Sequence, residues 1–219
     1  MSELTEAIKR GDAEEVGRIL DRDPASIDEV SGGVSAMMLA LYHGKNDIAR
    51  LFVARGRRLT FPEACALGER ARVEAMLREE PSLLDLKSPD GYPPVGLAIF
   101  FHHSEIARFL IEQGADVSAY ADNPNRVAPV HAAAAACDHE TMRMLLARGA
   151  NPNARQQMDY TALHGAASRG DIEMAKLLIE AGGDSKARGT DGKTLADLAI
   201  EHGHPAFAEW LTSAAGSNP

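Results

Sequence analysis

The sequence predicts an all-α solenoid of about seven stacked helix–turn–helix units. One alanine recurs at an interval of about 33 residues, and apolar residues at helical spacing follow it. Self-similarity at such a period indicates a stacked repeat protein. Each unit exposes an apolar face that only its neighbour can cover, so stacking builds one continuous core and an extended concave surface. The recurring alanines are Ala7, Ala40, Ala64, Ala98, Ala133, Ala166 and Ala199, with spacings of 33, 24, 34, 35, 33 and 33 residues.

One unit, between residues 160 and 182, shows the repeated motif most clearly. It begins with Tyr160–Ala166 (YTALHGA), turns at Gly170, continues with the helical segment Met174–Leu178 and closes at Gly182. The same frame recurs at Ala128–Ala133 (APVHAA) and Pro93–Ala98 (PPVGLA), whose units end at Gly149–Asn151 and Gly114–Asp116, and more loosely at Ser35–Ala40 (SAMMLA) and Thr194–Ala199 (TLADLA).

These motifs resemble the ankyrin repeat. The family pattern is Thr-Pro-Leu-His-x-Ala, then a glycine between two helices, then Leu-Leu-x-x-Gly-Ala-Asp. The resemblance covers nearly the whole chain, and it implies short β-hairpin loops between successive helix pairs. It also implies a concave groove lined by the hairpin tips and by the end of each first helix.

The residues themselves support two helices in each unit. Ser35, Thr161 and Thr194 can cap first helices with a side-chain oxygen. Glycines at the ends of second helices supply the left-handed conformation that terminates them. These glycines are Gly56, Gly114, Gly149 and Gly182, and the apolar positions of second helices include Ile48, Leu51, Phe52, Ile106, Phe109, Leu110, Met174, Leu177 and Leu178.

The third unit departs from this spacing. Residues 6–56 align with residues 63–114, so the N-terminal half is interpreted as a duplicated pair of units joined by Pro-containing linkers. Thr60 and Glu63 form a capping-box pattern with Pro62 in the first turn, which starts the helix about ten residues early. We therefore expect this unit to lack the projecting hairpin and to leave a notch in the hairpin row.

The chain is expected to form one domain over residues 1–213, followed by a disordered tail at 214–219. The first unit carries many charges and no hairpin, as an N-terminal cap requires, and Trp210 is predicted to seal the core of the last unit. The expected units span residues 1–28, 29–59, 60–86, 87–118, 119–153, 154–185 and 186–213.

Composition restricts the classes of partner. The formal net charge of −9 argues against nucleic acid, which requires clustered positive charge, and it would suit a basic protein. Met1–Glu6 show no signal-peptide pattern, no apolar run is long enough to span a membrane, and Cys65 and Cys137 fall in different units. We expect a cytoplasmic monomer without disulfides that binds neither nucleic acid nor membrane.

No catalytic or metal-binding pattern is found among the eight histidines or elsewhere. His131 and His164 occupy the motif's own histidine position, where the resemblance implies that the ring bridges backbone groups of neighbouring units. His102 and Cys137 stand where other units have the glycine between their helices, which leaves open both neutral drift and a functional role. We expect no cofactor, no metal and no enzymatic activity.

The candidate binding residues occupy variable positions of the implied groove. Tyrosine, phenylalanine, methionine and arginine are enriched at the centres of protein interfaces. The function predicted is a non-catalytic protein-binding module and scaffold, and a separate possibility, consistent with the acidic charge, is a dedicated inhibitor or neutraliser of a basic protein. The alternative is a small-molecule binder or atypical enzyme that uses a pocket near Phe100–His103. The candidate residues are Tyr42, His43, Tyr92, Phe100, Phe101, Arg126, Met158, Tyr160, Arg169 and Lys193.

Overall fold

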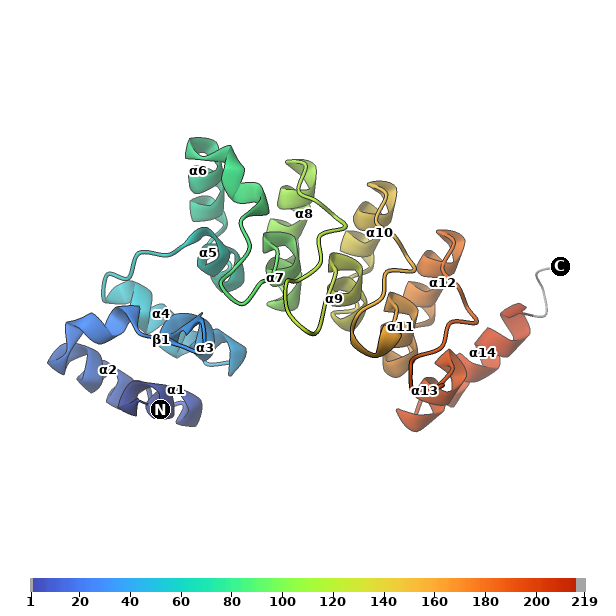
Figure 1. The fold of residues 1–219 in the computed structure, drawn as a ribbon, viewed down its shortest axis with the longest axis horizontal. Coiled ribbons are helices and arrows are strands. Elements are labelled where there is room, and N and C mark those ends of the chain that lie inside the picture. Colours follow the sequence, from blue (N-terminus) through green and yellow to red (C-terminus); the bar gives the residue numbers. More distant parts are fainter. Residues whose placement is uncertain (1, 216–219) are drawn as a thin grey trace.

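The computed structural model describes residues 2–215, and it confirms the all-α solenoid. Helices alternate between an inner row, which carries the recurring alanines, and an outer row, with α1 and α14 at opposite ends of the arc (Figure 1). The inner helices are α1 (Glu3–Arg10), α3 (Ala36–Tyr42), α5 (Phe61–Leu67), α7 (Pro94–Phe100), α9 (Pro129–Ala135), α11 (Ala162–Arg169) and α13 (Leu195–Glu201). The outer helices are α2 (Ala13–Arg22), α4 (Asn46–Ala54), α6 (Arg70–Glu79), α8 (Ser104–Glu112), α10 (His139–Ala147), α12 (Ile172–Glu180) and α14 (Pro205–Ala215).

The recurring alanines form the centre of the core. All seven have 0% exposure, from Ala7 in the first inner helix to Ala199 in the last. Alanine at this position leaves room for neighbouring helices to approach within the usual 8–10 Å between axes. The period read from the sequence is therefore the period of helix contact.

The loops between helix pairs contain little regular structure. The Pro-containing linkers form two 3₁₀ helices, η1 (Pro24–Asp28) and η2 (Pro81–Asp85), and a third, η3 (Gln157–Asp159), lies in a later loop. The one strand pair in the described residues is the hairpin of β1 (Val30–Ser31) and β2 (Val34–Ser35). The later hairpin loops, at residues 88–92, 121–127, 156–160 and 189–193, are each closed by a backbone hydrogen bond between their end residues.

These later loops join into a continuous row. The Asp122 N–H donates to the Gly91 carbonyl at 2.8 Å, and the Thr190 N–H donates to the Met158 carbonyl at 2.9 Å. A third backbone bond, from Gln157 to the Asn125 carbonyl, completes the row. From the second of these loops onward, each hairpin loop is thus hydrogen-bonded to the one before it.

The third unit lacks a hairpin loop, as expected. Only residues 55–60 separate α4 from α5, and the capping box of Thr60 and Glu63 is formed. The pair α5/α6 is turned relative to α3/α4, whereas the later pairs follow one another side by side (Figure 1). The solenoid therefore changes direction at the missing loop.

A buried ion pair lies at this change of direction. The Glu63 carboxylate accepts bonds from Ser35 Oγ and Arg57 Nη2, each at 2.7 Å, and from the Thr60 N–H at 2.9 Å. The side chains of Arg57 and Glu63 are only 8% and 5% exposed. Burial opposes ionisation of Glu63, but the hydrogen bonds from Ser35 and Thr60 and the charge of Arg57 together lower its pKa below the ordinary value. This cluster links the second unit to the third where no hairpin loop does so.

Helix capping follows the sequence with one exception. Ser35 and Thr194 accept the backbone N–H of Met38 and Asp197, as predicted. Thr161 occupies the predicted N-cap position, but its hydroxyl contacts the ring of His164 at 3.0 Å, and His164 Nδ1 accepts the Thr161 N–H, also at 3.0 Å. The buried imidazole therefore satisfies the helix start at this position.

The glycines between paired helices have a steric role as well as a left-handed backbone. Gly68 has a φ of +84°, and a Cβ on it would lie 2.5 Å from His103 Cε1 of the following unit. A Cβ on Gly170 would likewise lie only 2.6 Å from His204 Cγ of the last unit. A bulky residue just before an outer helix thus excludes any side chain from the turn of the preceding unit.

Two units have another residue in place of this glycine, and both fit the same steric rule. His102 and Cys137 adopt positive φ angles of 62° and 53°. The residues that follow the turn in the next units are the short Asp138 and Asp171, and Cys137 forms a hydrogen bond with Asp171. A smaller neighbour makes room for a side chain in the turn, which favours neutral drift over a functional role.

The core of the last unit differs from the prediction. Trp210 is only partly buried, and the residue sealed in the core is Phe207, with 1% exposure. The two rings are in edge contact, with centroids 5.4 Å apart. The corresponding residues of α12, Met174 and Leu177, show the same pattern, with Met174 buried and Leu177 only partly buried, so the position of Trp210 lies at the margin of the core. α14 also continues to Ala215, past the predicted start of the tail, and residues 216–219 lie outside the described residues.

No helix within residues 2–215 is long and apolar enough to cross a membrane.

Removing the sealed aromatic of the last unit should cost more than removing its partly exposed neighbour. We expect Phe207→Ala to lower the free energy of unfolding by about 3–5 kcal/mol, because it leaves a cavity in the core. Trp210→Ala should cost clearly less, since part of its ring already contacts solvent. Urea denaturation of both variants measures the difference, and the reverse order would place Trp210 in the core.

Breaking the buried ion pair should destabilise the chain in a pH-dependent manner. Arg57→Met leaves the Glu63 carboxylate without its cation, which should cost about 3 kcal/mol near neutral pH. The folded pKa of Glu63 is lowered, so its contribution to stability is present above its unfolded pKa and is lost as pH falls through the folded pKa. The difference between variant and wild type should therefore shrink in acid. The matched control is Arg58→Met, at an exposed neighbouring arginine. It should change the free energy of unfolding very little, both at neutral pH and in acid.

The steric role of the turn glycine can be separated from its backbone role. Gly44→Ala should cost about 1 kcal/mol for the positive φ alone, because no atom lies within 4 Å of its Cβ position. Gly68→Ala should cost at least about twice as much, because His103 must also move. In a His103→Ala background the cost of Gly68→Ala should fall to that of Gly44→Ala. An unchanged cost, measured by chemical denaturation, would contradict the steric explanation.

Candidate functional site

Three aromatic side chains from two units form a cluster at the ends of the inner helices. Tyr42 ends α3, Phe100 ends α7, and Phe101 follows directly. The Phe100 ring centroid lies 6.0 Å from that of Tyr42 and 5.0 Å from that of Phe101, both in edge-to-face contact. Phe101 and Tyr42 are partly buried against the core, whereas Phe100 is 56% exposed. The aromatic cluster is therefore anchored from below and presents one ring to solvent.

A hydrogen bond across the missing hairpin loop fixes Tyr42 in this cluster. Its hydroxyl donates to Asp90 Oδ2 at 2.6 Å, and Ser88 Oγ donates to the other carboxylate oxygen at 2.6 Å. Burial and the bond to Asp90 both raise the pKa of Tyr42 far above its ordinary value, so the phenol stays protonated. Asp90 lies in the loop at residues 88–92, so the fourth unit holds an aromatic ring of the second.

A hollow that we call the basic pocket opens on one side of the cluster. It has a volume of about 290 Å³, and its lining includes one arginine, two histidines and one asparagine but no aspartate or glutamate. Burial and the nearby charges of His102 and Arg50 lower the pKa of His103, whose Nε2 lies 3.0 Å from the Ala66 carbonyl oxygen. His103 is therefore neutral near pH 7 and donates this bond, so Arg50 supplies the pocket's permanent charge. The lining residues are Leu41, Tyr42, Gly44, Asn46, Arg50, Ala66, Leu67, Phe100, Phe101, His102 and His103.

A second hollow, which we call the apolar pocket, opens on the other side of Phe100. Its volume is about 190 Å³, and it extends across α7, α9 and α11 beneath the hairpin loops. Small residues create the space, since Gly96, Ala135 and Gly165 occupy positions where side chains would otherwise fill the surface. The lining residues are Tyr92, Gly96, Phe100, Val127, His131, Ala132, Ala135, Gln156, Thr161, Ala162 and Gly165.

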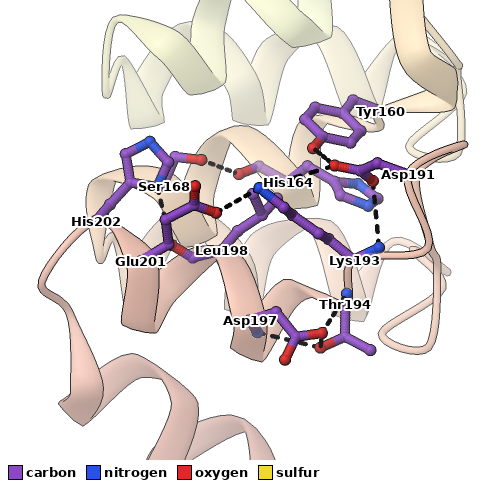
Figure 2. Close-up of polar contacts among 10 residues, drawn as sticks. All are labelled: Tyr160, His164, Ser168, Asp191, Lys193, Thr194, Asp197, Leu198, Glu201 and His202. Atoms are coloured by element: carbon purple, nitrogen blue, oxygen red, sulfur yellow. Dashed lines mark hydrogen bonds and ion pairs between the residues drawn. The ribbon is translucent and has the colours of Figure 1, made fainter.

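Two other predicted site residues lie in a separate network near the C-terminal end (Figure 2). The Tyr160 hydroxyl donates to Asp191 Oδ2 at 2.8 Å, and Lys193 Nζ donates to Glu201 at 2.6 Å. The Tyr160 ring stacks on the buried ring of His164, with centroids 4.7 Å apart and an interplanar angle of 8°. These contacts tie the last hairpin loop to α11 and α13, so Tyr160 and Lys193 already have partners within the chain.

A family model of ankyrin repeats (three copies) matches residues 61–156 and 130–219, which together exceed half of the chain. The chain belongs to the ankyrin-repeat family. Ankyrin repeats are generally protein–protein interaction modules, and proteins built from them are typically non-enzymatic scaffolds. No curated protein matches the sequence significantly.

The two motif histidines of this ankyrin-repeat protein behave differently. His131 Nδ1 accepts the Ala128 N–H at 3.0 Å, and its Nε2 lies 2.9 Å from the Ala154 carbonyl oxygen of the next unit. His131 therefore bridges neighbouring repeats as the family resemblance implies. His164 makes the first contact only, and its buried Nε2 has no hydrogen-bond partner among the described residues. Burial is the main cause that lowers the pKa of His164 to about 4, so the ring is neutral.

The remaining candidate residues are not brought together. His43 is exposed just after α3, and Arg169 is exposed at the end of α11. Arg126 lies over the Tyr120 ring at 5.2 Å, and Met158 is 46% exposed within η3. Both adopt positive φ angles, of 49° and 63°, at the tips of successive hairpin loops. Of the ten candidates, only Tyr42, Tyr92, Phe100 and Phe101 line the two pockets.

Sequence reasoning missed the residues that shape the ankyrin groove. Arg50 belongs to an outer helix, which the groove model leaves out, and Asp90 was not among the candidate residues. Gly96 and Ala135 contribute by being small. The available signal was the coincidence of small groove residues in three successive repeats, at positions where a binding surface would usually carry large ones.

No group of three or more metal-ligating side chains is found within residues 2–215. His139 Nε2 contacts Asp171 at 2.9 Å, and Asp171 also bonds Cys137. Burial and the carboxylate of Asp171 raise the pKa of the Cys137 thiol, which opposes thiolate formation. Cys65 is buried, and neither cysteine is in a disulfide.

Proposed function

We propose that this ankyrin-repeat protein binds a protein partner through the groove surface around the aromatic cluster. The observation that carries the proposal is the Phe100 ring, which is 56% exposed and stands between two pockets that share it as a wall. Exposed aromatic anchors beside pockets are typical of the centres of protein interfaces. Tyr42 and Phe101 fix the ring from below, so little conformational entropy is lost when a partner covers it.

Pocket size favours a protein over a small molecule. Sites for small molecules usually enclose about 300–1,000 Å³ and bury most of the ligand. The pockets here measure about 190 and 290 Å³ and share the Phe100 ring as a wall. Each suits a side chain of a bound segment, and together they fit a partner that crosses the Phe100 ring. The alternative ligand, a small molecule held near Phe100–His103, would use the basic pocket alone.

Photo-crosslinking tests where a partner binds. A photoreactive phenylalanine analogue placed at position 100 should crosslink a partner protein, whereas the same analogue at exposed Ala147 of α10 should not. Equal crosslinking from both positions would show that contact is not confined to the groove.

Removing the anchor should weaken binding without affecting folding. We expect Phe100→Ala to cost about 2 kcal/mol or more in binding to the crosslinked partner, measured by isothermal titration calorimetry. The melting temperature should be nearly unchanged, because most of this ring is outside the core. Leu86→Ala is the matched control, since Leu86 is 45% exposed but lines neither pocket. Full binding by Phe100→Ala would exclude the aromatic cluster as the contact.

A further inference from the structure

We infer that the bound partner segment carries an acidic side chain in the basic pocket and a bulky aliphatic side chain in the apolar pocket. The inference rests on the proposed function and specifies the chemistry of the partner. It differs from the expectation of a basic partner, which followed from net charge alone. The charges that line a pocket, and not the net charge of the whole chain, decide which group is stabilised there.

The lining of the basic pocket is opposite in charge to the chain as a whole. The protein has 32 acidic and 23 basic residues, yet the pocket contains Arg50 and no carboxylate. The Arg50 guanidinium forms no hydrogen bond or ion pair with any residue in the described part of the chain. The carboxylate of Asp90, which reaches Tyr42, is already held by two hydroxyl donors. A partner carboxylate would therefore find an arginine available for a charge-assisted hydrogen bond.

Two helix N-termini reinforce this preference. The residues that precede α4 and α8 are Lys45 and His103, and neither accepts a capping hydrogen bond. By contrast, Asp12, Asp138 and Asp171 cap α2, α10 and α12 with their side chains. The basic pocket is lined by residues at or just before the starts of these two helices: Gly44, Asn46, His102 and His103. Each helix has one acidic residue in its first turn, Asp47 in α4 and Glu105 in α8, and neither lines the pocket. Uncapped N-termini carry partial positive charge, which favours an anion near them.

The apolar pocket selects a different side chain. Glycine, alanine, valine and aromatic residues provide most of its wall. Three polar side chains also line it: His131 and Thr161 are buried and already hydrogen-bonded within the chain, and Gln156 is half-buried in a hairpin loop. None of the lining residues carries a permanent charge, so a charged group placed there would lose its hydration without gaining an ionic partner. A leucine, isoleucine or methionine side chain matches the space and the chemistry.

The shared wall sets the spacing of the two side chains. Phe100 lines both pockets, so a segment that crosses this ring has one side chain on each side of it. An extended chain advances about 3.3 Å per residue, so the acidic and aliphatic residues should be about two to four positions apart. The groove follows the row of inner helices, so the segment runs along the solenoid.

Selection from a phage-displayed library of random peptides on the full chain tests the pattern. Enriched peptides should combine Asp or Glu with Leu, Ile or Met at the stated spacing. Enrichment of Lys or Arg in place of the acidic residue, or no enriched pattern, would overturn the inference. Peptides that bind equally well to the Phe100→Ala variant would count against the proposed function itself.

Variants of the two pockets then test each contact with the best selected peptide. Arg50→Glu should weaken binding at least about tenfold, because an ionic hydrogen bond is replaced by repulsion. A peptide with lysine at the acidic position should recover affinity for Arg50→Glu but not for wild type. The matched control is Arg72→Glu, which makes the same charge change on the exposed surface of α6.

Filling the apolar pocket tests the second contact. Ala135→Leu adds a side chain at an exposed, pocket-lining helical position and should also weaken binding about tenfold. Ala147→Leu adds the same side chain on α10, outside the pocket, and should leave affinity unchanged. Peptides that need Phe100 but tolerate both Arg50→Glu and Ala135→Leu would leave groove binding intact and refute the inferred partner chemistry.

Discussion

Close contact between successive inner helices is the constraint on which the structure depends. Seven alanines in register have no exposed surface, and the inner helices that carry them contact one another in succession along the solenoid. A larger side chain at any of them would push two units apart, and the displacement would pass to every later pair. The repeat length of about 33 residues, the bridging ring of His131 and the row of bonded hairpin loops all preserve this one spacing.

The third unit shows how the solenoid tolerates a local departure from this order. It keeps its buried alanine, Ala64, but lacks the loop that would align it with the second unit. The buried Arg57–Glu63 pair and the Tyr42–Asp90 hydrogen bond make the connection instead. Because these side chains permit a change of direction, the basic pocket opens at the junction. The irregularity in the repeat and the candidate site therefore have a common origin.

Small residues shape the groove as much as the aromatic ones do. Gly96, Ala135 and Gly165 leave the apolar pocket unfilled, and Phe100 stands at its edge. The size of neighbouring residues also matters at the turns between paired helices. Gly68 is needed beneath the bulky His103, whereas the short Asp171 leaves room for the side chain of Cys137. Residues that carry no reactive chemistry thus determine where side chains of a partner could enter.

The sequence by itself determined the repeat period, the helix pairs and the missing hairpin loop. Each of these follows from local patterns, because helical spacing, caps and turn glycines act within a few residues of one another. Only the tertiary structure decided that Phe207 rather than Trp210 is buried, that Tyr160 and Lys193 contact their own chain, and that Arg50 joins the site. The burial of Phe207 and the bond of Lys193 to Glu201 depend on packing within the last unit. The Tyr160 contact and the position of Arg50 depend on how neighbouring units pack, which involves contacts between residues about 30 or more positions apart, such as Tyr160 with Asp191 and Tyr42 with Asp90. The repeat period in the sequence determines which positions of neighbouring units face each other. The orientation of the side chains at those positions depends on how the units pack in three dimensions.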